Sequence, residues 1–441
     1  MTQPETAVHH YLQALEGLGG DERGHASELR RHAIERFVEL GFPTMKNEDW
    51  HYTSVAPIVT REFNRTSSPG PVAPTDVDQL LFGAPEWLRL VFVDGWFAPE
   101  LSNFEDRAGV QAGNLSAVLA RGRRSDVAEL GTIADHQTAA FTALNTALMQ
   151  DGAVIRIGAN VEMDTPIHLV FVSAQPVPLS ASFPRNLLVL DRGASATVIE
   201  SYVGVRDESY LTVPVTEVSL GDGARLEHIK VQNESPGAFH VGTMQARQER
   251  DSELHSFSYA AGAELSRTNI YTLLDGEGSS CTMNGMYMVS GLQHVDHQTR
   301  IEHAQPNTTS REIYKGILDG HSHGVFNGKV FVRPEAQKTD GKQSNNNLLL
   351  SDHARVDTKP QLEIFADDVR CTHGATVGRL DEVALFYMKS RGLDAEQART
   401  LLIYAFAAEV LEEISLKPVR DSLEAAVFAR VRGEELHVTS D

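Results

Sequence analysis

The feature that most constrains this fold is a run of short apolar–polar alternations that extends from about residue 153 to about residue 370. The segments 154–157 and 167–172 are two examples, and Gly and Asp residues separate such segments at short intervals. Successive side chains of a strand point to opposite faces, so alternation with period two indicates strands. Frequent turn residues between the strands indicate an all-β domain.

A weak internal repeat bears on the kind of β domain. Leu190-Asp191-Arg192-Gly193-Ala194 recurs as Leu220-Gly221-Asp222-Gly223-Ala224, returns in altered form at 350–354, and recurs in part at 274–276. A turn of fixed chemistry followed by similar strands is typical of stacked rungs, as in a β-helix. We expect the three asparagines at 345–347 to lie at such a stacked turn. The pattern alone is equally compatible with a β-sandwich.

Helical patterns precede and follow the β region. Upstream, five apolar residues share one face of a helix that Gly41 and Pro43 should end: Leu29, Ala33, Ile34, Phe37 and Val38. A strand near 88–93 and a helix over 134–149, with Phe141, Leu144 and Leu148 facing inward, are expected next.

Three more helices are expected after the β region. Asp381 should start the first, and Asp394-Ala395-Glu396-Gln397 resembles a capping box that opens the second. The run 401–408 is apolar nearly all round, which predicts burial by this chain or by a partner. Val419, Leu423, Val427 and Val431 recur at four-residue spacing in a last helix, which Gly433 should end.

Composition restricts the classes of function. There are 39 Lys and Arg against 60 Asp and Glu, a formal net charge of −21, so we expect no nucleic-acid binding. No run of about 18 apolar residues predicts a membrane span, and the N-terminus lacks a signal-peptide pattern, so we expect a cytoplasmic protein. The two cysteines, Cys281 and Cys371, are fewer than the about four thiolates that usually hold an iron–sulfur cluster.

Histidines in the second half of the chain are candidate metal ligands: His294, His297, His303, His321, His323, His353 and His373. Residues two apart in a strand lie on one face, so His321 and His323 could bind the same ion. The alternative, for these and for His294 and His297, is ordinary surface or turn histidines.

Cys371-Thr372-His373-Gly374 is the more specific pattern. On a strand, Cys371 and His373 would share one face, and a thiolate with an imidazole suits iron or zinc. Two ligands would leave coordination positions of the metal ion open, and residues of a second chain could fill them. The alternative is a buried cysteine beside a turn histidine.

A signature of nucleotide hydrolysis does not occur. The chain contains no GxxxxGK[ST] phosphate-binding loop, so we expect no ATPase activity, and we expect no other catalytic activity of the isolated chain. Asp367-Asp368 could imitate the carboxylate pair of a β-helix enzyme acting on carbohydrate, but neighbours on a strand point to opposite faces. A cleft lined by several carboxylates and aromatic residues would favour that alternative.

The second half of the chain also resembles the SufB/SufD family of iron–sulfur cluster assembly proteins. The resemblance covers about residues 280–415 and is densest in Val356-Asp357-Thr358-Lys359-Pro360-Gln361 and in Arg370-Cys371-Thr372-His373-Gly374. In the family, the second motif is Lys-Cys-Ser-His-Gly. A weaker match includes Glu48-Asp49-Trp50-His51-Tyr52.

The resemblance implies a mainly β fold with a right-handed parallel β-helix core over 153–378. It implies a mostly helical or mixed region over 1–152 and a C-terminal helical domain over 379–441. It also implies a non-catalytic subunit of a SUF complex that pairs with SufB along the β-helix and with the SufC ATPase through the C-terminal helices.

The same resemblance implies that His373 and Cys371 are interfacial ligands of iron or a nascent cluster, completed by SufB, with no cofactor held tightly by the chain alone. Two cysteines argue against SufB itself, which is usually richer in cysteine. The isolated chain is expected to form a homodimer through the surface that otherwise meets SufB.

Overall fold

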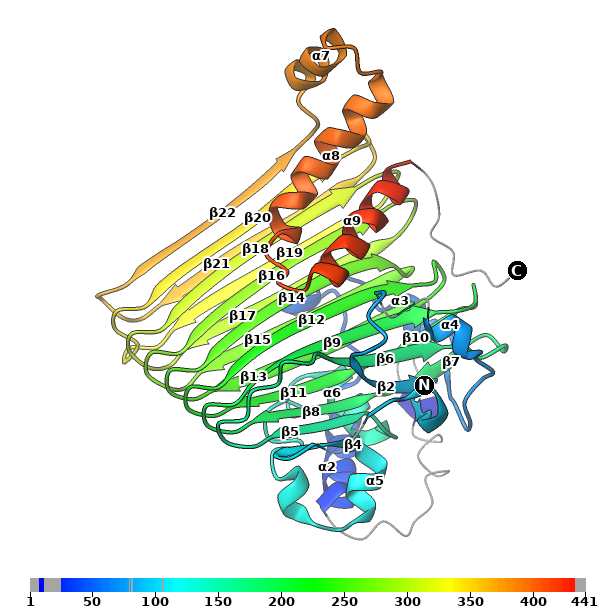
Figure 1. The fold of residues 1–441 in the computed structure, drawn as a ribbon, viewed down its shortest axis with the longest axis vertical. Coiled ribbons are helices and arrows are strands. Elements are labelled where there is room, and N and C mark those ends of the chain that lie inside the picture. The colour runs from blue at the N-terminus through cyan, green and yellow to red at the C-terminus, as the bar shows by residue number, and fades with distance from the viewer. Residues whose placement is uncertain (1–7, 12–24, 79, 81, 105–106, 433–441) are drawn as a thin grey trace.

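Two sheets of mainly parallel strands run along the molecule in a computed structural model that describes residues 8–11, 25–78, 80, 82–104 and 107–432 (Figure 1). The chain passes alternately between the sheets, so that from residue 215 onward each strand of the β-helix pairs with the strand two places further along the sequence. This arrangement is a parallel β-helix of about eight turns. Parallel pairing confirms the predicted β-helix and makes the β-sandwich alternative wrong.

The first sheet contains β5 (Ala153–Ile157), β8 (Arg185–Leu190), β11 (Val215–Leu220), β13 (Phe239–Gln248), β15 (Leu265–Leu274), β17 (His294–His303), β19 (His323–Val332) and β21 (Arg355–Ile364). The second contains β6 (Ile167–Ser173), β9 (Ser195–Gly204), β12 (Arg225–Glu234), β14 (Glu253–Gly262), β16 (Ser280–Val289), β18 (Thr309–Leu318), β20 (Asp340–Leu349) and β22 (Arg370–Gly378). Apolar side chains from both sheets fill the space between them.

Shorter strands extend these sheets: β2 (Leu88–Val93), β3 (Trp96–Phe97), β4 (Val110–Asn114), β1 (Asn64–Arg65), β7 (Ser180–Ser182) and β10 (Tyr210–Thr212). The helices are α2 (His25–Leu40), α3 (Ala56–Thr60), α4 (Pro74–Asp78), α5 (Leu115–Ala120), α6 (Ala140–Leu148), α7 (Glu382–Ser390), α8 (Ala395–Leu411) and α9 (Lys417–Val431). Because β2 and β4 pair with β6 and β5, the sheets reach back beyond residue 153. The predicted division of the chain into three regions, with boundaries at residues 152 and 378, stays a prediction.

The repeated turns stack as the sequence predicts. Leu190 and Leu220 are paired in register at the ends of β8 and β11, and Gly221 N donates to Leu190 O at 2.8 Å. Gly193 and Gly223 have φ of +67° and +65°, a conformation that glycine adopts without the steric cost of a Cβ. The alanines that follow them are buried in the core.

The prediction for the three asparagines is wrong. Residues 345–347 lie in the middle of β20, not at a turn. Asn345 and Asn347 are buried, and Asn347 Nδ2 donates to Asn345 Oδ1 at 2.7 Å. Asn347 Oδ1 also accepts a hydrogen bond from the hydroxyl of Tyr287, two strands away in the same sheet. Polar side chains can therefore occupy inward positions when they bond to one another.

Two helix predictions in the N-terminal region need correction. α6 begins at Ala140 rather than near residue 134, because the backbone N–H groups of Ala134 and Asp135 donate to the side chains of Glu217 and Gln245 on the β-helix. These bonds hold the segment in turns and bends, while the expected inward residues of α6 are buried. In α2, Leu29, Ala33 and Phe37 are buried, but Val38 is 48% exposed and does not face inward.

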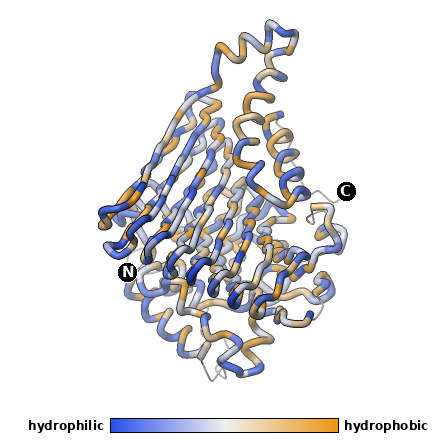
Figure 2. The backbone as a smooth tube through the Cα atoms, turned by 60° about the vertical axis from the view of Figure 1, so that its left-hand side comes forward, coloured by the Kyte–Doolittle hydropathy of each residue, from blue (hydrophilic) through white to orange (hydrophobic). Residues whose placement is uncertain are grey.

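The C-terminal helices α8 and α9 lie against the outer face of the second sheet. Asp381 caps α7 by accepting from Val383 N and Ala384 N, and the predicted capping box opens α8. Apolar residues of α8 and α9 pack on outward residues of β12, β14 and β16, and hydrophobic colours recur along both helices in Figure 2. Gly433, the predicted end of α9, lies outside the described residues. None of the helices described is long and apolar enough to cross a membrane.

Candidate metal centre at the open end of the β-helix

Cys371 and His373 lie on β22, which is the terminal strand of the second sheet (Figure 1). In the part of the chain that the structure describes, β22 pairs only with β20 and leaves its other edge unpaired. Cys371 is half-buried and His373 is exposed. The strand geometry places the two side chains on the same face, as predicted from their spacing.

That face is the inner face of the β-helix. His373 is in register with Gln343 of β20, whose side chain enters the space between the sheets and bonds to buried Glu312. Cys371 is in register with Gly341, and a Cβ on that glycine would lie 3.4 Å from the Cys371 Sγ. The pair therefore faces the end of the β-helix interior, where no further rung of the described chain covers it.

Cys371 and His373 are two potential donors without a third beside them among the described residues. Among the described residues, no three His, Cys, Asp or Glu side chains converge closely enough to hold a metal ion. Burial raises the pKa of the Cys371 thiol, so proximity to a cation would be needed to favour the thiolate.

Behind the pair lies a buried acid that sequence reasoning missed. Glu312 is 1% exposed, and Gln343 Nε2 donates to its Oε2 at 2.6 Å. Burial raises the pKa of Glu312 to about 7, against the opposing effects of the Thr299 hydroxyl and the Gln343 amide. Glu312, Gln343 and His373 are in register on three successive strands of one sheet, a relation that the alternation in the sequence does not show.

The other histidines do not assemble into one site. His321 lies in a turn and stacks on His353 with ring centroids 4.5 Å apart, whereas His323 lies in β19 and bonds through Nε2 to Asp357 Oδ2 at 2.7 Å. The expectation that His321 and His323 lie two apart on one strand is therefore wrong. His294 Nε2 lies 2.9 Å from the Thr53 hydroxyl, which ties the N-terminal region to the first sheet.

His297 and His303 are buried inside the β-helix. Burial lowers the pKa of each to about 3, so both imidazoles are neutral at physiological pH. His303 bonds to the hydroxyls of Thr308 and Ser310, and His297 stacks on Tyr287 with ring centroids 5.3 Å apart. These side chains act as parts of the core.

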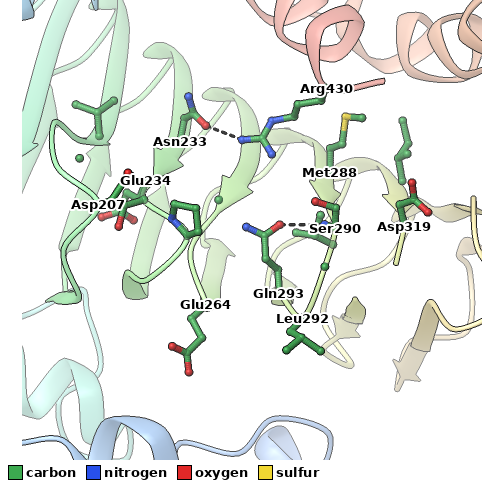
Figure 3. Close-up of a pocket in the computed structure, with 18 of the residues that line it drawn as sticks. Asp207, Asn233, Glu234, Glu264, Met288, Ser290, Leu292, Gln293, Asp319 and Arg430 are labelled. Carbon is green, nitrogen blue, oxygen red and sulfur yellow. Dashed lines mark hydrogen bonds between the residues drawn. The ribbon is translucent and has the colours of Figure 1, made fainter. Parts of the chain in front are cut away.

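A cavity of about 650 Å³ lies between the C-terminal helices and the turns of the second sheet (Figure 3). Arg430 of α9 donates to Asn233 Oδ1 at 2.9 Å across it, while Asp207, Glu264 and Asp319 stand apart around its rim in Figure 3. None of the described residues that line it is aromatic. A carbohydrate site is expected to combine carboxylates with aromatic platforms, so this cavity does not favour the enzyme alternative. A second cavity, of about 480 Å³, has both kinds of side chain in its lining, among them Asp49, Glu302, Trp50 and Tyr271.

The fold and the cysteine–histidine pair define a class: parallel β-helix proteins that present two potential metal ligands on a terminal strand. Comparison with known proteins gives the family. Residues 171–406 match the SufBD core domain of SUF-system FeS cluster assembly proteins, and residues 1–169 match the SufBD protein N-terminal region. The chain therefore belongs to the SufBD family of iron–sulfur cluster assembly proteins.

Individual relatives agree with this assignment. An iron–sulfur cluster assembly SufBD family protein of Synechocystis sp. is 34% identical over 97% of this chain and 96% of its own length. The iron–sulfur cluster assembly protein SufD of Escherichia coli is 32% identical over 96% of each chain. SufD of Bacillus subtilis is 30% identical over 66% of this chain and 67% of its own length.

Proposed function

We propose that this chain is the SufD-type, non-catalytic subunit of a cytoplasmic SUF complex. In that complex it pairs with SufB and with the SufC ATPase, and it contributes His373, with Cys371 beside it, to iron or a nascent cluster at the SufB interface. The observation that carries the proposal is the exposed histidine on the unpaired terminal strand, since a donor there is open to a second chain. The likeness to proteins named SufD and the low cysteine content support it.

The edge of β22 favours pairing with another β chain. An unpaired strand presents a row of free N–H and C=O groups that can bond to a further strand. A SufB β-helix that meets this edge would bring its own donors next to His373. In the absence of SufB, the same edge is expected to pair with a second copy of this chain, which light scattering on the purified chain measures as a dimer.

His373→Ala in the co-expressed complex tests the ligand role. We expect the complex to assemble with normal stoichiometry but to retain at least about tenfold less iron and sulfide after anaerobic purification, since loss of a donor weakens metal binding. His353→Ala is the matched control, because His353 is an exposed histidine at a turn of the same end of the β-helix. Normal iron and sulfide in His373→Ala, or dissociation of the complex, would contradict the proposal.

A further inference from the structure

A column of polar side chains leads from His373 into the β-helix interior. In the second sheet, Glu312 of β18 pairs in register with Gln343 of β20, and Gln343 pairs in register with His373 of β22. Neighbouring strands are about 4.8 Å apart, so in-register side chains on one face lie within reach of one another. Figure 1 shows β18, β20 and β22 as consecutive strands at the end of the sheet. Glu312 and Gln343 are 1% and 4% exposed.

Glu312 fixes which way the Gln343 amide points. Gln343 Nε2 donates to Glu312 Oε2 at 2.6 Å, and either protonation state of the carboxyl group offers an oxygen that accepts this bond. Gly328 of the opposite sheet leaves room for this amide, because a Cβ added to Gly328 would lie only 2.3 Å from Gln343 Nε2. The nitrogen end of the amide is therefore held by the acid and fits closely against the glycine.

The oxygen end of the same amide lacks a partner. Gln343 Oε1 is buried and accepts no hydrogen bond from any described group. A buried acceptor without a donor destabilises the fold, so such groups usually have a partner in the functional state. The side chain next to it on the open side is His373, an imidazole that carries an N–H when neutral.

We propose that Gln343 and Glu312 are positioning residues for His373: Gln343 Oε1 accepts the N–H of one ring nitrogen, which leaves the lone pair of the other nitrogen directed at the interface. Metal-bound histidines commonly donate their second ring N–H to a neighbouring acceptor, which fixes the tautomer and orients the ring. Glu312 acts one step further back by holding the amide in the required orientation. The inference rests on the proposed ligand role of His373.

The tautomer of His373 in the purified full-length chain tests the positioning directly. Ring nitrogen shifts are recorded by NMR at a pH where histidines are neutral, and the His373 signals are assigned by their loss in His373→Ala. We expect a single tautomer in the unmodified chain and a mixture in Gln343→Leu, which lacks the acceptor. Glu312→Gln is also expected to give a mixture, because an amide at 312 can hold the Gln343 amide in either orientation.

A double variant and a matched control separate positioning from damage to the fold. Exchanging the two groups in Glu312→Gln/Gln343→Glu keeps an amide–carboxylate pair and should restore a single tautomer. Asn346→Ala removes the bond between Asn346 Oδ1 and the Thr376 hydroxyl, which joins the same two strands on their outer face. It should leave the tautomer unchanged. A single tautomer that persists in Gln343→Leu, or no rescue by the double variant, would overturn the proposal.

Iron binding by the co-expressed complex gives the second readout. Loss of the second hydrogen bond of a ligating histidine typically weakens metal binding about 10–100-fold, so Gln343→Leu should retain less iron by that factor than Asn346→Ala. Failure of the ligand role and failure of the positioning role give different results. If His373→Ala retains normal iron, the ligand role fails, whatever the tautomer. If His373→Ala loses iron but Gln343→Leu keeps one tautomer, only the positioning role fails.

Discussion

Phe386→Asp in α7 is expected to weaken binding of the SufC ATPase by at least about 100-fold. Val383, Phe386 and Tyr387 are 76%, 74% and 57% exposed, and their spacing puts them on neighbouring positions of one helix face. α7 projects beyond the strands (Figure 1). Removal of a central aromatic contact costs about 2 kcal/mol or more at an interface, and a buried aspartate adds a desolvation cost.

The structure argues for a point substitution rather than a deletion. Residues of α8 and α9, such as Ile403 and Leu423, cover outward apolar residues of the β-helix, such as Phe257. Lys315 of β18 is buried and donates to Phe406 O of α8 at 2.9 Å. Removing everything after Asp381 would expose this surface, so a truncated β-helix is not expected to stay soluble. In α7 no residue is fully buried, so its surface can change without loss of the core.

Co-purification of SufC with tagged variants of this chain measures the effect, and titration calorimetry with purified SufC gives the affinity. Val177→Asp is the matched control, because Val177 is an exposed apolar residue, 64% accessible, outside the C-terminal helices. Equal SufC affinity for Phe386→Asp and Val177→Asp would show that α7 is not the docking helix.

The sequence predicts those parts of the fold that depend on local chemistry. The turns at 191–194 and 221–224 require glycine with positive φ and a small buried residue after it, so Gly-Ala recurs at these two turns. The capping box at Asp394 is equally local. The spacing of Cys371 and His373 placed them on one face because alternation along a strand involves no other part of the chain.

Features that depend on pairing between distant segments were missed. The alternation does not show which position of β20 lies beside His373, because register between rungs is set by the turns that separate them. Gln343 and Glu312 therefore resembled ordinary polar residues of a strand. The same limit misplaced the asparagines at 345–347, whose partners include Tyr287 on a strand far upstream. The start of α6 was also misplaced, because its preceding segment bonds to Glu217.

Arg185→Met is expected to lower the free energy of unfolding of the N-terminal half of the β-helix by about 3–5 kcal/mol. Arg185 and Glu217 are both fully buried, and Arg185 Nη2 donates to Glu217 Oε2 at 2.8 Å. Arg185 Nη1 also donates to Asn145 Oδ1 and Thr146 Oγ1 of α6. Removing one member of a buried pair leaves the other charge uncompensated, which accounts for the size of the effect.

The loss of stability in Arg185→Met should first affect the contact between the N-terminal region and the first sheet, and only then the whole β-helix. Glu217 also accepts from the backbone N–H groups of Gly131, Ile133 and Ala134, so the pair joins the segment before α6 to the first sheet. Trp50 stacks on Phe141 of α6 with ring centroids 5.4 Å apart. Its fluorescence during urea unfolding, recorded with Trp87 and Trp96 replaced by Phe in every variant, therefore reports on this region.

Arg225→Met is the control for the pair, because Arg225 and Glu253 also join neighbouring rungs but are 69% and 42% exposed at 3.6 Å. Exposed ion pairs contribute about 0–1 kcal/mol, so this variant should unfold at nearly the unmodified urea concentration. Guanidinium and carboxylate are the same in both pairs, so burial is the main variable compared. Similar midpoints for Arg185→Met and Arg225→Met would mean that water or a neighbouring donor replaces Arg185, and that the buried pair does not secure the N-terminal region to the β-helix.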